Sequence, residues 1–175
     1  MIEKIISGGQ TGVDRAALDV AIELKIPHGG WCPKERLSES GTIPFHYSLQ
    51  ETETSDYSER TKLNIRDSDG TLIIVPKLPV DVTDGTILTI QEVQDKRKPY
   101  YLFDLSGKED LSSISVWLKK NNIRILNVAG PRESQSPGIY NRCYELLKKI
   151  LGWEAGLQNK ICCKNEFKNE TITPI

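Results

Sequence analysis

Short apolar runs alternate along this chain with stretches of helical periodicity, and this alternation constrains the fold more than any other feature. The runs typical of buried strands are residues 2–6, 71–75, 100–103 and 125–129. The stretches with one apolar helical face are residues 13–24, 111–118 and 139–150, with a weaker one at 85–96. Strands buried on both faces and separated by helices are typical of a parallel sheet between helical layers. The sequence therefore predicts an α/β fold, a Rossmann-like three-layer sandwich with a mostly parallel sheet.

Length and composition restrict the organisation and the partners. A chain of 175 residues fits one domain with one core, which we expect at 1–152, followed by a polar C-terminal tail at 153–175 that is flexible or docks a partner. The 23 basic and 24 acidic residues nearly cancel, which argues against a general nucleic-acid binder. No apolar run reaches membrane-spanning length, and the first residues resemble a strand rather than a signal peptide. We expect a cytoplasmic protein that makes no membrane contact.

The cysteines and histidines do not form a metal-binding or disulfide pattern. No CxxC spacing occurs among the four cysteines, which are Cys32, Cys143, Cys162 and Cys163. The two histidines, His28 and His46, are far from most of these cysteines in sequence. We therefore expect no metal site, and we interpret the cysteines as small buried apolar residues or inert tail thiols.

A glycine-rich loop, SGGQTG at residues 7–12, joins the first predicted strand to the first predicted helix. The amides at a helix N-terminus attract phosphate or carboxylate, and glycines let the backbone approach a ligand closely. The loop is not a P-loop, because Val13 and Asp14 stand where that motif has Gly and Lys. It also lacks the GxGxxG dinucleotide pattern. The two interpretations are an anion-binding loop and a tight turn in which Asp14 complements the helix dipole.

Two more loops follow predicted strands, where ligands bind in sheets of this type. Gly85 and Thr86 open a predicted helix and offer amides and a hydroxyl, although Asp-Gly is also a common turn. The stretch NVAGPRES at 127–134 places Arg132 where it can bind a phosphate or carboxylate bidentately, unless it is an ordinary surface arginine. Ser134 and Ser136 follow as further donors. These loops are expected to meet at one ligand.

Two polar segments are candidate pocket walls. If residues 57–69 are helical, Tyr57, Arg60, Asn64 and Asp67 share one polar face, which is either solvated or part of the pocket. Trp31 is either a platform for a planar heterocycle or a core anchor. It lies in a segment, 26–55, without regular periodicity, which we expect to form an insertion over a sheet edge or the ligand site.

Four motifs together carry a family resemblance. In order, they are GGQTGVDRAALDVA, PHGGWCPK, YSERTKLNIRDSDGTLII and LNVAGPRESQSPGIY. They closely resemble the family named putative molybdenum carrier proteins, a circularly permuted branch of the SLOG superfamily, over residues 1 to about 152. The chain departs from the expected glycine-rich pattern at residues 77–84, which read KLPVDVTD.

The resemblance implies a Rossmann-like fold that binds molybdenum cofactor, a nucleotide or phosphate, and a homo-oligomer whose partners include molybdoenzymes. By motif, the residues lining the ligand would be Gly8, Gly9, Gln10, Thr11, Gly12, Asp14, Arg15, Gly85, Thr86, Gly130, Pro131, Arg132, Glu133, Ser134 and Ser136. Trp31, Asn64 and Asp67 join them from the residue-level argument.

A binding protein for a small anionic molecule is the first hypothesis, and no catalytic residue is assigned. The alternatives are a nucleotide sensor and a phosphoribohydrolase that cleaves nucleotide N-glycosidic bonds. Hydrolysis is disfavoured because Thr89 stands where those relatives have Glu, and Glu92 lies one turn further along.

Overall fold

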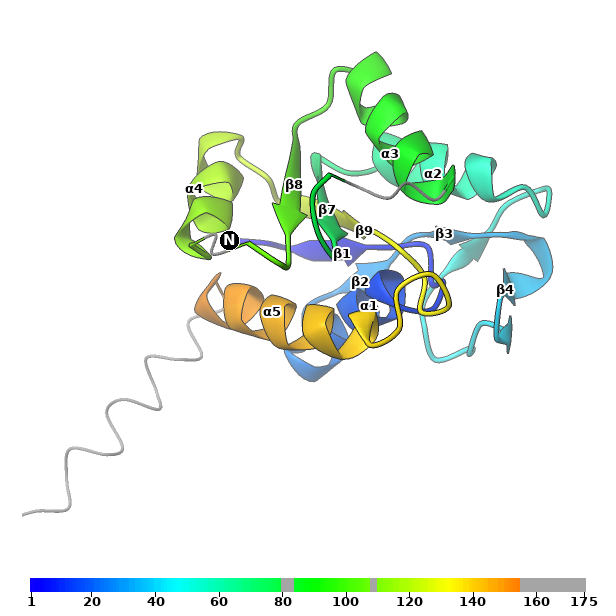
Figure 1. Ribbon diagram of the computed structural model, residues 1–175. Coiled ribbons are helices and arrows are strands. Elements are labelled where there is room, and N and C mark those ends of the chain that lie inside the picture. Colours follow the sequence, from blue (N-terminus) through cyan, green and yellow to red (C-terminus); the bar gives the residue numbers. More distant parts are fainter. Residues whose placement is uncertain (80–83, 108–109, 155–175) are drawn as a thin grey trace, which may run out of the picture.

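The main sheet has five parallel strands in the order β2-β1-β9-β7-β8 (Figure 1). The computed structural model describes residues 1–79, 84–107 and 110–154. The strands are β1 (Lys4–Ile6), β2 (His28–Gly29), β7 (Gly70–Val75), β8 (Tyr100–Asp104) and β9 (Ile125–Ala129). The four predicted strands are confirmed within two residues at each end. β2 was not predicted, because two residues are too short to show a periodic pattern.

Helices cover both faces of this sheet, as predicted. They are α1 (Val13–Glu23), α2 (Tyr57–Arg66), α3 (Asp84–Asp95), α4 (Ser112–Lys120) and α5 (Ile139–Glu154). Helices α2 and α3 lie on one face, and α1 and α5 lie on the other (Figure 1). Strand β7, which lies between β9 and β8, is buried on both faces because Leu72 and Ile74 join the core with α1 and α5, whereas Ile73 and Val75 pack against α2 and α3.

The segment between α1 and α2 folds as an insertion beside α1. It contains β3 (Trp31–Cys32), a 3₁₀ turn η1 (Lys34–Arg36), the hairpin strands β4 (Leu37–Ser38) and β5 (Gly41–Thr42), and β6 (Gln50–Glu51). Leu18 of α1 packs with Cys32, Ile43 and Tyr47. The buried Arg36 guanidinium donates to four backbone carbonyls of residues 43–49. These hydrogen bonds stabilise a segment that has little regular secondary structure of its own.

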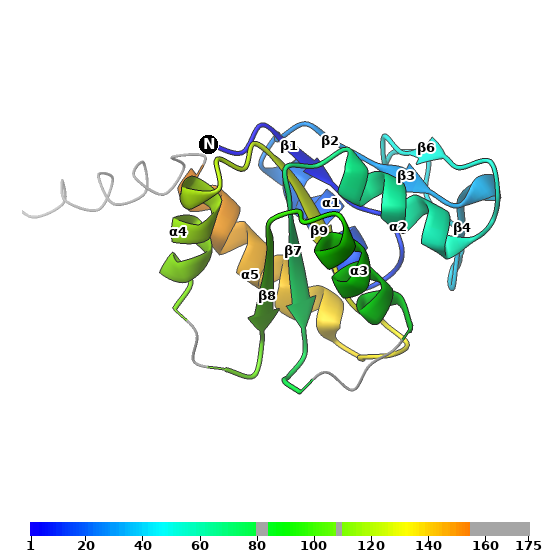
Figure 2. The same ribbon diagram turned by 90° about the horizontal axis from the view of Figure 1, so that it is seen from above.

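The loops that follow β1, β7 and β9 emerge at the same end of the sheet, where α3 begins (Figure 2). This arrangement is required by parallel strands, and it brings residues distant in sequence to one edge. No helix in the described part of the chain combines the length and apolarity needed to cross a membrane. Helix α5 runs to Glu154, two residues beyond the predicted end of the domain. Cys162 and Cys163 lie outside the described residues.

Candidate functional site

A cavity of about 230 Å³ lies at the carboxyl end of the sheet. Four elements line it: the glycine-rich loop, α2, the start of α3 and the loop after β9. The lining residues are Gln10, Tyr57, Arg60, Gly85, Thr86, Gly130, Arg132 and Gln135. The structure thus brings together the three loops and the helix face that the sequence indicated separately.

A buried ion pair fixes the arginine of this cavity. Arg60 Nη1 lies 3.0 Å from Asp14 Oδ2, and the Asp14 residue is only 2% exposed. Burial raises the pKa of Asp14, against the opposing influence of the Arg60 charge and of the Gln10 amide, which donates to the carboxylate at 3.3 Å. A Cβ on Gly8 would lie 1.8 Å from Arg60 Nη1, so the glycine is what allows the guanidinium to reach Asp14.

Two residues that line this cavity each carry a buried polar atom without a hydrogen-bond partner in the described structure: Arg60 Nε and Thr86 Oγ1. Thr86 is 3% exposed, and an unpaired buried hydroxyl costs about 1–3 kcal/mol. Thr89 in the same helix shows the usual alternative, because its hydroxyl donates to the Gly85 carbonyl at 2.9 Å. A Cβ on Gly85 would meet no atom of the described residues within 4 Å, so that part of the chain leaves space at the helix start. Both orphan atoms therefore belong to residues that a polar ligand in the cavity can reach.

The glycine-rich loop is largely bonded within the protein. The amide of Thr11 donates to the Gln10 side chain at 3.0 Å, and that of Val13 donates to the Pro131 carbonyl at 3.3 Å. Gly12 has a φ of +76°, and a Cβ there would lie 2.5 Å from the same Pro131 oxygen. The close approach that Gly12 permits is thus to the loop after β9. Ligand contact at these amides stays a prediction.

Arg15 contacts the insertion and is not one of the described residues that line the cavity. Its Nε donates to the Gly9 carbonyl at 3.3 Å, and its Nη2 donates to the Ser38 hydroxyl at 2.9 Å. Asp14 and Arg15 therefore diverge at the start of α1, and only Asp14 reaches the cavity, through Arg60.

Trp31, Asn64 and Asp67 form a separate network that joins β3 to α2. The Asn64 amide exchanges two hydrogen bonds with the Trp31 backbone, at 2.7 and 3.0 Å. The Trp31 indole donates to Asp67 Oδ2 at 2.8 Å, and hydrogen bonds from Arg66 and Trp31 outweigh desolvation and lower the pKa of Asp67. The polar face of α2 is therefore divided: Tyr57 and Arg60 line the cavity, while Asn64 and Asp67 hold the insertion strand.

The loop after β9 is divided in the same way. Gly130 and Arg132 line the cavity. Glu133 instead accepts hydrogen bonds from the amides of Gly138, at 2.5 Å, and Tyr140, at 3.0 Å, at the start of α5. Ser136 is joined to the loop through its own amide, which donates to the Arg132 carbonyl at 3.2 Å.

Four residues at or beside the cavity were not assigned to the site from sequence: Tyr57, Arg60, Gln135 and Glu39. The first two lie on the polar face that periodicity identified, so a signal for them existed. Glu39 belongs to the β4–β5 hairpin and accepts hydrogen bonds from Thr11 and Ser134. Only the expectation that the insertion covers the ligand site pointed toward it.

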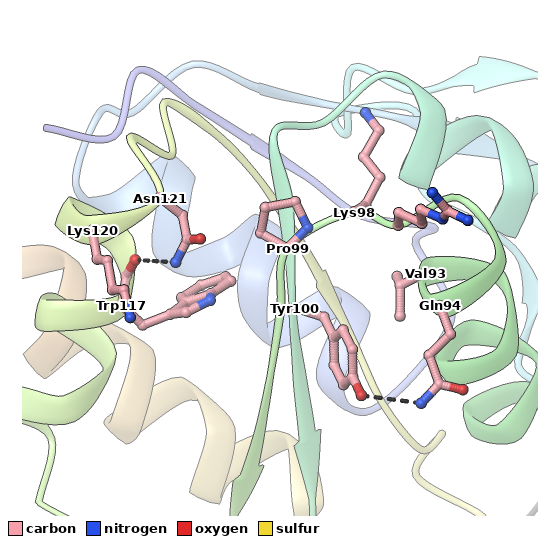
Figure 3. Close-up of a pocket in the computed structure, with 9 residues that line it drawn as sticks. Val93, Gln94, Lys98, Pro99, Tyr100, Trp117, Lys120 and Asn121 are labelled. Atoms are coloured by element: carbon pink, nitrogen blue, oxygen red, sulfur yellow. Dashed lines mark hydrogen bonds between the residues drawn. The ribbon is translucent and has the colours of Figure 1, made fainter.

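A larger hollow, of about 590 Å³, lies at the opposite end of the sheet, between the ends of α3 and α4 and the start of β8 (Figure 3). Several of its polar groups are bonded to the protein: Gln94 donates to the Tyr100 hydroxyl at 3.1 Å, and Lys98 Nζ donates to the Ser68 carbonyl at 2.5 Å. The two orphan atoms identified above lie at the other end. The smaller cavity is therefore the better candidate site.

Metal-ligating side chains do not gather in the described part of the chain, where no group of three or more His, Cys, Asp or Glu residues is placed to hold an ion. Cys32 and Cys143 are free and buried.

The sheet order, the helical layers and the cavity at the strand carboxyl ends define a Rossmann-like α/β domain. The model of the circularly permutated YpsA SLOG family matches residues 5–151, and the chain belongs to this family. A solved structure named a putative molybdenum carrier protein, from Syntrophus aciditrophicus SB, is 46% identical in sequence. The match covers 86% of this chain and 95% of that one, with a TM-score of 0.79. Among curated proteins, no match was found.

Proposed function

We propose that this protein binds a small molecule carrying a phosphate-like group and holds that group against Arg60, Thr86 and the Gly85 backbone. The observation that carries the proposal is the pair of orphan atoms, Arg60 Nε and Thr86 Oγ1, on one cavity. A guanidinium N–H, a hydroxyl and the amides of a helix N-terminus are donors that suit an oxyanion. A bound anion would be the acceptor that these two donors lack among the described residues.

The cavity volume suggests which part of the ligand it takes. Pockets that enclose a drug-sized ligand measure about 300–1,000 Å³. At 230 Å³, this cavity suits the anionic end of a larger molecule, with the remainder outside. The similar protein named a molybdenum carrier supports a molybdenum-related cargo, and molybdopterin and nucleotides both carry such an anionic end.

Binding is favoured over hydrolysis by the charges at the site. The described residues that line the cavity include no carboxylate, and the Glu39 carboxylate beside it is bonded to Thr11 and Ser134. The Glu92 carboxylate lies 3.1 Å from Lys96 Nζ, so it is engaged along its own helix. Cleavage of an N-glycosidic bond needs a carboxylate beside the sugar.

Titration calorimetry with inorganic phosphate, AMP and purified molybdenum cofactor tests the proposal. Gly85→Ala places a methyl group in open space and should weaken binding of each anion without unfolding the protein. Gly152→Ala is the matched control, because it also adds a methyl group to a helix where no described atom lies within 4 Å. Equal affinities for the two variants, or no binding by the folded wild type, would contradict the proposal. Release of free base from AMP would favour the hydrolase.

A further inference from the structure

The β4–β5 hairpin places a carboxylate among donors that suit an anion, directly beside the cavity. Glu39 accepts hydrogen bonds from the hydroxyls of Thr11 and Ser134 and, at 3.1 Å, from the Ser134 amide. Arg132 Nε lies 3.5 Å from the same carboxylate. Two hydroxyls, one backbone amide and one guanidinium form a donor set that proteins also use for phosphate.

The hairpin is held in this position from two sides. The Glu39 amide donates to the Gln10 side chain at 3.0 Å, and Arg15 donates to Ser38 at 2.9 Å. Glu39 lies at an exposed hairpin tip, but its side chain turns back onto these donors and is 18% exposed. Gln10 and Arg132 both contact Glu39 and line the cavity, which makes the two anion positions contiguous.

We propose that Thr11, Ser134 and Arg132 form a second oxyanion subsite, of the phosphate class, which the Glu39 carboxylate occupies until a ligand displaces it. The inference shares its ligand chemistry with the proposed function but concerns a different set of donors. A carboxylate and a phosphate cannot share these donors, because like charges at contact distance repel. Although desolvation opposes them, hydrogen bonds from Ser134 and Thr11 keep the pKa of Glu39 below its ordinary value, so the competitor is charged at neutral pH.

The proposal predicts a gain of binding when the carboxylate is removed. Glu39→Ala should bind two inorganic phosphates per chain at concentrations where the wild type binds one, as counted by titration calorimetry. If the subsite is open in about one wild-type molecule in ten, its apparent phosphate affinity rises about tenfold in the variant. Glu53→Ala, which removes an exposed carboxylate elsewhere in the insertion, should behave as the wild type.

The outcomes separate this inference from the proposed function. An unchanged phosphate count and affinity in Glu39→Ala would overturn the inference, and weaker binding would show that Glu39 supports the site instead. If the wild type binds no phosphate and Glu39→Ala binds one, the proposed binding at Arg60 and Thr86 is wrong and the subsite at Thr11, Ser134 and Arg132 is supported. Glu39→Gln, which keeps the side-chain shape and removes its charge, provides the same comparison if the alanine variant does not fold.

Discussion

Replacing Thr86 by valine should make the ligand-free protein more stable and its ligand binding weaker. The substitution removes the hydroxyl and keeps a side chain of nearly the same shape. Thr86 is 3% exposed and its hydroxyl has no partner in the described structure. A threonine that costs stability in the free protein is explained if it serves a ligand.

The magnitude follows from the cost of an unpaired group. Leaving a buried hydroxyl unsatisfied costs about 1–3 kcal/mol, so Thr86→Val should raise the free energy of unfolding by about 1–2 kcal/mol. In a protein of this size each kcal/mol shifts the melting temperature by about 2–4 °C. A hydrogen bond to a charged group is worth about 1.5–3 kcal/mol, so the dissociation constant for phosphate should rise by roughly tenfold or more.

Urea denaturation with and without ligand measures both effects on one sample. Ligand at about 100 times its dissociation constant stabilises the wild type by about 2.7 kcal/mol, and the variant should gain less at the same concentration. Thr89→Val is the matched control in the same helix. It loses a 2.9 Å hydrogen bond to the Gly85 carbonyl and should destabilise the protein by about 1 kcal/mol.

If Thr86→Val destabilises the free protein as much as Thr89→Val does, the Thr86 hydroxyl has a partner in solution and is not held for a ligand. If Thr86→Val is more stable than the wild type but binds phosphate equally tightly, the ligand does not contact the Thr86 hydroxyl.

Three further predictions concern Gly8, Cys143 and Asp67. Gly8→Ala should destabilise the protein by about 3–5 kcal/mol, measured by urea denaturation, because its Cβ would displace Arg60 and leave buried Asp14 without its ion pair; a loss below about 1 kcal/mol would contradict this. Burial raises the pKa of the Cys143 thiol to about 12, so peptide mapping after thiol labelling at pH 8 should find it modified only in denaturant, and rapid labelling of the native protein would refute its burial. The pKa of Asp67 is lowered in the folded protein, so its carboxylate contributes stability that is complete above the ordinary pKa of 3.8 and is lost as pH falls through the folded-state pKa. Asp67→Asn should therefore flatten the dependence of the urea midpoint on pH below about 4. Parallel curves for the two proteins would count against this prediction.

The elements that could be predicted are those whose apolar residues follow the periodicity of a buried strand or an amphipathic helix. Strand β7 is buried on both faces and reads as a continuous apolar run, and α1 and α5 show apolar stripes where they pack on the sheet. The insertion could not be predicted in detail, because its strands have two residues each and its organising contact is the buried Arg36 side chain. Such a contact leaves no periodic signal in the sequence.

The site could be predicted at the level of loops but not of atoms. Parallel topology requires that the loops after β1, β7 and β9 meet, and the structure places Gln10, Thr86 and Arg132 on one cavity. Some side chains of these segments bond to a neighbouring helix and do not face the cavity. Which ones do so depends on contacts between residues that are distant in sequence. Glu133 bonds to the start of α5, and Trp31 is held by α2.

The division between paired and unpaired donors changes where an anion is expected to bind. Loop position alone favours the amides of residues 9–12, but the Thr11 amide already donates to the Gln10 side chain, and moving it would break that bond. Among the described residues, Arg60 Nε and Thr86 Oγ1 have no such bond to lose, so a ligand that reaches them gains hydrogen bonds without breaking bonds of that part of the protein. The glycines of the first loop then act indirectly: Gly8 leaves the space in which Arg60 reaches Asp14, and that ion pair holds the guanidinium at the cavity.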